Sequence, residues 1–138
     1  MSDQHFSDAL NFARGVHHTN FATCDDGQPH VRLMHWVRIE DDFTIWLATR
    51  ASSRKAAHIV LNPKVCTMFV SEPGYARVFG IAEIVNDQKI KDDLWKDEWE
   101  MYWPDGSSNP DYVLLKIHPS SVDYLNMGAG DTDPRKVL

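Results

Sequence analysis

The chain has 138 residues and a formal net charge of −6, from 14 basic and 20 acidic residues. This length predicts one domain, and 43% hydrophobic with 25% charged residues is typical of a globular protein rather than a disordered one. The acidic balance and the absence of a basic cluster argue against a nucleic-acid partner, because phosphates must be neutralised by clustered cations.

The sequence also carries signals about the compartment. Cys24 and Cys66 form no Cys-x-x-Cys motif, and we interpret them as free thiols in a reducing compartment. The N-terminus lacks the basic and apolar run of a signal peptide, and no apolar stretch approaches the roughly 18 residues of a membrane span. We therefore expect a cytoplasmic protein with no membrane partner.

Three helices are predicted in chain order. The first is capped by Ser2 and ends at Gly15. The second begins at Ser52 or Ser53 and ends before Pro63, and the third begins at Asp87. The acidic run over residues 92–100 is interpreted as the solvated face of that third helix.

Strands account for most of the remaining chain, because apolar and polar residues alternate between turn signals such as Asp26-Gly27. Gly80 lies within one predicted strand and indicates a bulge, a bend or a close backbone approach. Residues 103–111 are predicted to be a loop, and the tail from about Gly128 is expected to be loose. The six or seven predicted strands cover residues 16–24, 31–38, 43–49, 65–71, 75–85, 112–118 and 122–126.

These elements predict a mainly β fold (β+α) with a single domain over 1–138. Most connections are short enough to join antiparallel neighbours, and the helix between the third and fourth strands is the exception. A small antiparallel barrel with inserted short helices satisfies this pattern and hides most sheet edges.

The segment from Thr49 to Lys55 has the clearest chemical signal. It follows a strand and begins a helix, so backbone N–H groups, serine hydroxyls and the charges of Arg54 and Lys55 would gather where a phosphate could bind. Cations in the first turn oppose the helix dipole, and a bound anion would offset this. The alternative is an ordinary capped helix with solvated cations.

Other polar residues give weaker signals. Arg32 and Met34 share a strand face that suits a planar polar ligand, although an arginine at a barrel rim fits equally. The seven histidines predict no metal site, because adjacent His17 and His18 point to opposite faces, as do His30 and His35. We find no Ser/His/Asp set or carboxylate pair, so no catalytic residue is predicted.

An ordered series of segments resembles one known superfamily. Residues 27–32, Thr49, 53–59, 62–65 and 78–83 are similar to the pyridoxamine 5′-phosphate oxidase-like superfamily, the FMN-binding split barrels. This similarity covers residues 19–85, and the later segment 103–124 resembles the general stress protein 26 branch.

The resemblance implies a six- to seven-stranded antiparallel split β-barrel that binds FMN at the interface of a homodimer. By position, residues of two predicted strands would line the isoalloxazine ring and ribityl chain of FMN. The start of the second predicted helix would hold the FMN phosphate, and the second subunit would add further contacts. The implied residues are Arg32, Leu33, Met34, His35, Trp36 and Val37; Ala48 and Thr49; Ser53, Arg54 and Lys55 for the phosphate; and Tyr75 and Trp103 from the partner side.

Departures from the family pattern limit the implied activity. Val37 stands where the true oxidases have Lys, Tyr75 stands where they have Gln, and their C-terminal Arg-x-His has no counterpart in residues 126–138. We therefore expect a stress-protein-type oxidoreductase that uses FMN and NAD(P)H on an unknown small molecule, not a true pyridoxamine phosphate oxidase. Alternatives are a flavin-storing or flavin-sensing protein without turnover, or a split barrel that uses F420 or heme.

Overall fold

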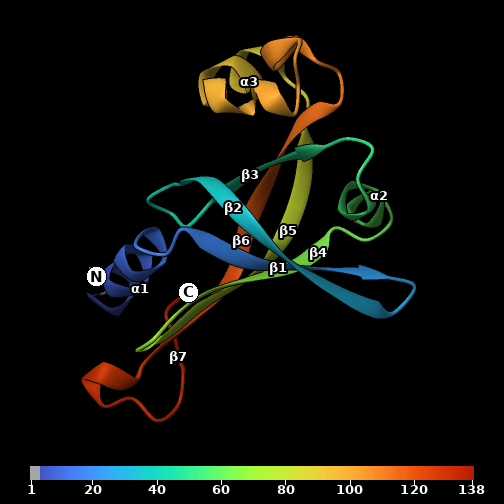
Figure 1. The fold of residues 1–138 in the computed structure, drawn as a ribbon. Helices are drawn as coiled ribbons and strands as arrows, with labels where there is room; N and C mark the ends of the chain where they lie inside the picture. The colour runs from blue at the N-terminus through green and yellow to red at the C-terminus, as the bar shows by residue number, and fades with distance from the viewer. Residues whose placement is uncertain (1–3) are drawn as a thin grey trace.

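The computed structural model describes residues 4–138, so the predicted cap at Ser2 lies outside the described residues. Figure 1 shows a barrel with one helical segment projecting from it. The elements are α1 (Gln4–Arg14), β1 (His18–Asp25), β2 (Gln28–Ile39), β3 (Ile45–Arg50), α2 (Arg54–Leu61), β4 (Lys64–Ser71), β5 (Gly74–Val85), α3 (Gln88–Leu94), β6 (Tyr112–Asn126) and β7 (Arg135–Lys136), with short 3₁₀ helices η1 (Asp97–Met101), η2 (Gly106–Ser108) and η3 (Met127–Ala129).

Six strands form a closed antiparallel barrel, which confirms the predicted fold class. The strand order is β3-β2-β1-β4-β5-β6, and β3 also pairs with β6 to close the ring. The β1–β2 hairpin turns at Asp26 and Gly27, which both have positive φ, as the Asp-Gly signal predicts. Helix α2 joins β3 to β4, which are not paired with each other, as expected from the longer connection.

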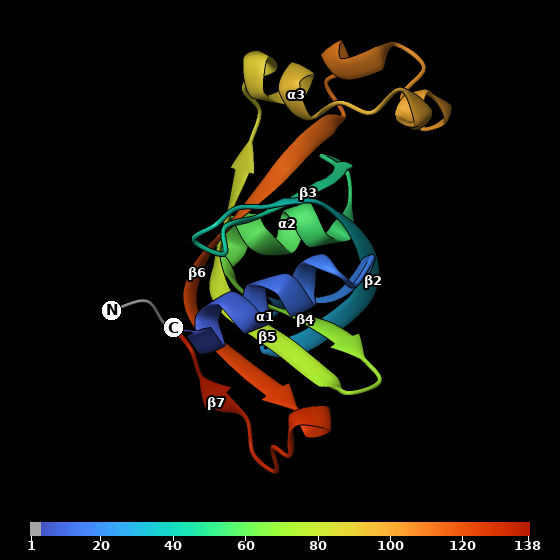
Figure 2. The ribbon, with the colours of Figure 1, turned by 90° about the vertical axis from the view of Figure 1, so that its left-hand side faces the viewer.

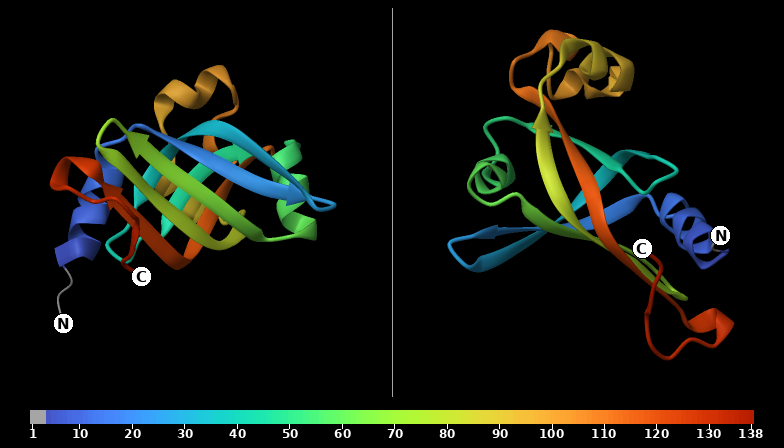
Figure 3. Two further views of the ribbon diagram at one scale, coloured as in Figure 1. Left: turned by 90° about the horizontal axis from the view of Figure 1, so that it is seen from below. Right: turned by 180° about the vertical axis from the view of Figure 1, so that it is seen from behind.

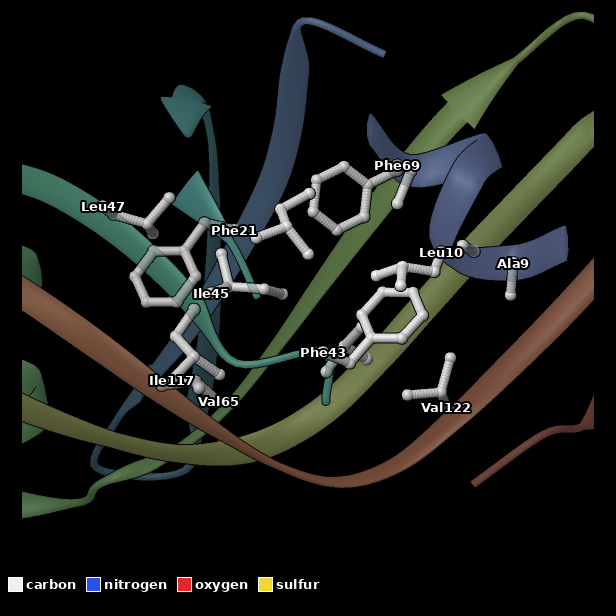
Figure 4. Close-up of a cluster of buried hydrophobic side chains, with 14 of the residues drawn as sticks. Ala9, Leu10, Phe21, Phe43, Ile45, Leu47, Val65, Phe69, Ile117 and Val122 are labelled. Carbon is white, nitrogen blue, oxygen red and sulfur yellow. The ribbon is translucent and has the colours of Figure 1, made fainter. Parts of the chain in front are cut away.

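The barrel interior is the main hydrophobic core. Phe21, Ile45 and Phe69 are fully buried there, and Figure 4 shows their side chains converging from different strands. Helix α1 packs beside the barrel and directs Ala9 and Leu10 into the same core (Figures 2 and 4). Each of the large side chains in this core, such as phenylalanine, isoleucine and leucine, contributes about 1.5–3 kcal/mol through removal of its apolar surface from water.

The last two predicted strands are one continuous strand, β6. It pairs with β5 along nearly its whole length, as Figure 3 shows from behind. The prediction was wrong because Pro119 and the serines after it look like a turn, whereas the chain accommodates them as an irregularity opposite Phe79 and Gly80. The close approach predicted at Gly80 is present: an added Cβ would lie 2.5 Å from the His118 carbonyl oxygen.

The C-terminal segment also differs from the expectation of a loose tail. Strand β7 pairs with β6, and the Val137 amide donates a hydrogen bond of 2.8 Å to the Val122 carbonyl. Val137 is buried against the main core. The end of this segment is therefore held in place by apolar burial that a Gly-, Asp- and Pro-rich composition does not reveal.

Residues 86–111 between β5 and β6 form a projecting lobe of short helices (Figure 1). Its aromatic side chains pack in a second, smaller core with Trp46 and Tyr112. Helix α3 is shorter than the acidic run suggested, since it ends at Leu94. Over residues 4–138, no helix has the length and apolar character required to cross a membrane.

Candidate functional site

A groove of about 940 Å³ lies between β2, β3, the start of α2 and the lobe. This volume falls in the range of small-molecule and cofactor sites. The structure brings together most of the predicted binding residues along its walls. They are Arg32, Leu33, Met34, His35, Trp36, Val37, Ala48, Thr49, Ser53, Lys55 and Trp103.

Two predicted residues do not line this groove. Arg54 is exposed at the first position of α2, whereas Lys55, the next residue, is half-buried and faces the groove. Tyr75 lies on β5 and contacts Arg77, whose guanidinium carbon is 5.4 Å from the Tyr75 ring centroid. A contribution of Tyr75 from a second subunit stays a prediction.

Strand β2 forms one long wall. All residues from 32 to 37 line the groove, although side chains along a regular strand alternate between faces, so the backbone of β2 forms part of this wall. The pairing of β2 with β3 shifts register between Trp36 and Arg38, and such an irregularity bends a strand and increases its twist. The Trp36 indole is fixed by donating a hydrogen bond of 2.6 Å to the Val16 carbonyl.

Two cations meet at one end of the groove. Arg32 donates to Thr23 Oγ1 at 2.8 Å and to the Phe21 carbonyl at 3.2 Å, which fixes its guanidinium against the barrel wall. Burial lowers the pKa of Arg32, and burial together with the positive charge of Arg32 lowers the pKa of Lys55. Within residues 4–138, neither cation has a carboxylate within salt-bridge distance.

Ser53 and Thr49 add hydroxyl groups to the wall that carries these cations. Ser53 caps α2 by accepting a hydrogen bond of 3.3 Å from the Ala56 amide, and Thr49 Oγ1 lies 3.4 Å from Ser53 Oγ. The first amides of a helix have no partner within it and carry a partial positive charge. An anion here would offset both the helix dipole and the repulsion between Arg32 and Lys55.

Aromatic residues of the lobe form the facing wall. Trp103 is buried, and its Nε1–H has no hydrogen-bond partner among the residues that the structure describes. The guanidinium carbon of Arg50 lies 5.8 Å from the Trp103 ring centroid. Trp99 packs edge-on against Trp103, with ring centroids 6.1 Å apart. This wall suits a flat ligand, because aromatic rings pack favourably against one another.

Sequence reasoning missed several lining residues. Trp99 was placed within a solvated acidic helix face, but it follows the end of α3 and lines the groove. The available signal was the recurrence of tryptophan inside that acidic run, since large aromatic side chains are rarely left fully solvated. The other lining residues that were not predicted are His17, Arg50, Lys96, Glu98, Met101 and Tyr102.

Comparison with known proteins decides the family. Residues 10–126 match the family model described as Pyridoxamine 5′-phosphate oxidase. The chain belongs to this family. It is also 33% identical over 114 residues to General stress protein 26 of Bacillus subtilis (strain 168), covering 79% of each chain, which supports the general stress protein 26-like branch.

Solved structures of this oxidase family share the fold. General Stress Protein 26 from Bacillus anthracis superposes with a TM-score of 0.81 at 26% identity, covering 98% of both chains. A protein related to general stress protein 26 from Clostridium acetobutylicum superposes with a TM-score of 0.83 at 22% identity, covering 99% of this chain and 95% of that chain. The resemblance inferred from the sequence segments is thereby confirmed.

Proposed function

We propose that this chain is an FMN-binding flavoprotein that acts as an oxidoreductase on a small molecule, with NAD(P)H as electron donor. The observation that carries the proposal is the pair of cations, Arg32 and Lys55, gathered in the groove without a carboxylate partner in the described part of the chain. FMN has a phosphate at one end and a flat ring system at the other. The cations of the groove match the phosphate, and its aromatic wall matches the ring system.

The residues present fit FMN. Ser53, Lys55 and Arg32 would hold the phosphate, while the side chains of β2, including Met34 and Trp36, would lie along the ribityl chain and ring. FMN, when bound, supplies hydride or electron transfer chemistry. The chain's own contribution is to bind the phosphate, orient the ring beside β2, and exclude water with the lobe.

A homodimer is part of the proposal. The strand registers place Val31, Ala22, Cys66 and Phe79 in one row across the outer face of β2, β1, β4 and β5. Val31 is 70% exposed and Phe79 is 41% exposed, which is a large apolar surface to leave in water. Leu33 belongs to both this outer face and the groove, so a second copy seated here would meet the proposed flavin site.

The substrate differs from that of the true oxidases in this proposal. Val37 lies in the groove where those enzymes have a cationic side chain, and the segment 126–138 offers no Arg-x-His to hold the vitamin phosphate. We also propose a cytoplasmic location, which the two free cysteines support.

The visible absorption spectrum and an FMN titration test the proposal. We expect flavin bands in the purified protein, or quenching of added FMN fluorescence, with micromolar or tighter affinity and one FMN per chain of a dimer. Absence of FMN binding would overturn the flavin assignment, and parallel titrations with F420 and heme would then identify another ligand. Binding without a defined product from NAD(P)H would favour storage or sensing over turnover.

A further inference from the structure

A second cluster of ligand-type side chains lies at the β1–β2 hairpin. Asp25, His30 and His58 each offer one possible ligand atom, and these three atoms lie within 4.8 Å of one another. The three residues are separate from the residues that line the groove. They come from β1, β2 and α2, so the fold, rather than a local motif, assembles them.

The hairpin register explains how Asp25 and His30 meet. Thr23 pairs with His30, and Asp25 pairs with Gln28, so Asp25 and His30 are diagonal neighbours across two strands. Thr23 and Asp25 are two residues apart on β1 and share a face. Helix α2 covers this face and brings His58 onto it, where the imidazole is buried.

The contacts of His58 orient its ring. Its Nδ1 and Thr23 Oγ1 share a hydrogen bond of 2.8 Å, and Thr23 Oγ1 also accepts a hydrogen bond of 2.8 Å from Arg32. Its Nε2 faces Asp25 Oδ2 at 3.8 Å, beyond hydrogen-bond distance, and the His30 ring centroid is 4.8 Å from its own. A histidine that donates from Nδ1 to an oxygen offers the Nε2 lone pair to a metal.

We propose that Asp25, His30 and His58 bind a divalent transition-metal ion of the Zn²⁺ type. Two imidazoles and one carboxylate are a ligand set that Zn²⁺ accepts, with water in a fourth position, whereas Ca²⁺ and Mg²⁺ prefer oxygen ligands throughout. Tetrahedral Zn²⁺ with bonds of about 2.0–2.1 Å separates its ligand atoms by about 3.4 Å. The distance of 3.8 Å from His58 to Asp25 is close to this value.

An ordinary His–Asp ion pair is the competing explanation. It would use only His58 and Asp25, and it gives no role to the His30 imidazole, whose ring centroid lies 4.8 Å from that of His58. Arg32 opposes a cation electrostatically, because it donates to Thr23 Oγ1 at 2.8 Å and to the His30 carbonyl at 3.4 Å, whereas the Asp25 carboxylate favours a cation and lies at the site itself. The bound ion would join the β1–β2 hairpin to α2, the helix that is capped by Ser53 and has Lys55 in its first turn.

Metal titration of the chelator-treated full-length protein tests the proposal. We expect one Zn²⁺ per chain by calorimetry, with a dissociation constant of about 10 μM or tighter, and a visible Co²⁺ spectrum from a nitrogen–oxygen ligand set. Asp25→Asn and His30→Gln should each weaken binding at least about tenfold. Asp25 is half-exposed, so its variant remains informative even if substitutions at buried His58 fail to fold.

His118→Gln is the matched control, because His118 forms an exposed pair with Glu83 at 2.9 Å outside the cluster. It should bind Zn²⁺ like the parent, and Zn²⁺ should raise the melting temperature of both but not of Asp25→Asn. Unchanged affinity in Asp25→Asn and His30→Gln would overturn the proposal. Loss of binding in His18→Gln alone would also overturn it, since the His18 and His35 ring centroids lie 4.2 Å apart and that pair would then hold the ion.

Discussion

Replacing Lys55 with alanine separates phosphate binding from ring binding. Lys55 faces the groove beside Arg32, and both cations lack a carboxylate partner among residues 4–138. Lys55→Ala is expected to weaken FMN binding while leaving riboflavin binding unchanged, because riboflavin has no phosphate. The same change removes the repulsion between Lys55 and Arg32, so the ligand-free variant should unfold no more easily than the parent.

The magnitude follows from the surroundings of Lys55. A hydrogen bond to a charged group contributes about 1.5–3 kcal/mol, and about 1.4 kcal/mol corresponds to a tenfold change in affinity. Lys55 is only half-buried, so solvent screening reduces the contribution, and relief of repulsion in the free protein stabilises the variant. We therefore expect the FMN dissociation constant to rise about tenfold, from a loss of about 1–2 kcal/mol.

Fluorescence titrations with FMN and riboflavin measure this difference directly. Arg54→Ala is an informative comparison, because Arg54 is adjacent in sequence but exposed and outside the groove, and its effect should be much smaller. Lys64→Ala removes an exposed lysine elsewhere and controls for net charge. Equal losses for FMN and riboflavin, or no loss for either, would refute the assignment of Lys55 to the phosphate.

Three further predictions concern the barrel and its surfaces. Gly80→Ala should lower the free energy of unfolding in urea by about 1–3 kcal/mol, because its Cβ would clash with the His118 carbonyl; an unchanged midpoint would contradict this packing. Phe79→Asp should give a monomer by light scattering, and a persistent dimer would move the interface elsewhere. The hydrogen bond from the Ser52 amide lowers the pKa of Asp111. The stability that Asp111 contributes is therefore present above the unfolded aspartate pKa of about 3.9, and it is lost as the pH falls through the lower pKa of the folded state. Asp111→Asn should lower the free energy of unfolding at pH 7, and this difference from the parent should disappear in acid.

The sequence predicted strands and turns where the local chemistry is strong. Asp26-Gly27 predicted the tight turn and Asp87 the cap of α3, and of the two serines predicted as the cap of α2, Ser52 or Ser53, the structure shows Ser53. Barrel closure by β3 and β6 was favoured only indirectly, because pairing between residues 45–50 and 112–117 leaves no local signal. The continuity of β6 through Pro119 was missed for the same reason, since β5 stabilises it from a distance in sequence.

The groove was predicted unevenly for a related reason. Residues on β2, β3 and the start of α2 lie in or beside segments that resemble the family, and the order of these segments was enough to predict their place in the site. The lobe contributes Trp99 and Tyr102 to the wall of the groove, and it has little regular secondary structure. The hydrophobic periodicity of the sequence therefore gives no sign of their position. The proximity of His30 and His58 could not be predicted either. Sequence spacing relates histidines that are close in the chain, whereas these two lie on a strand and on a helix that packs against it.

The lobe is the connection between two paired strands, β5 and β6, and such a connection can change during divergence within the family without changing the barrel. Val85 at its start pairs directly with Leu114 just after its end, so the strands on either side meet with or without the residues between them. The ring of six strands closes through contacts that the lobe does not make. Substitutions, insertions or replacement of residues 86–111 can therefore reshape one wall of the groove while the frame and its cationic end stay constant. Descendants of one barrel could acquire different substrates by exchanging this wall alone.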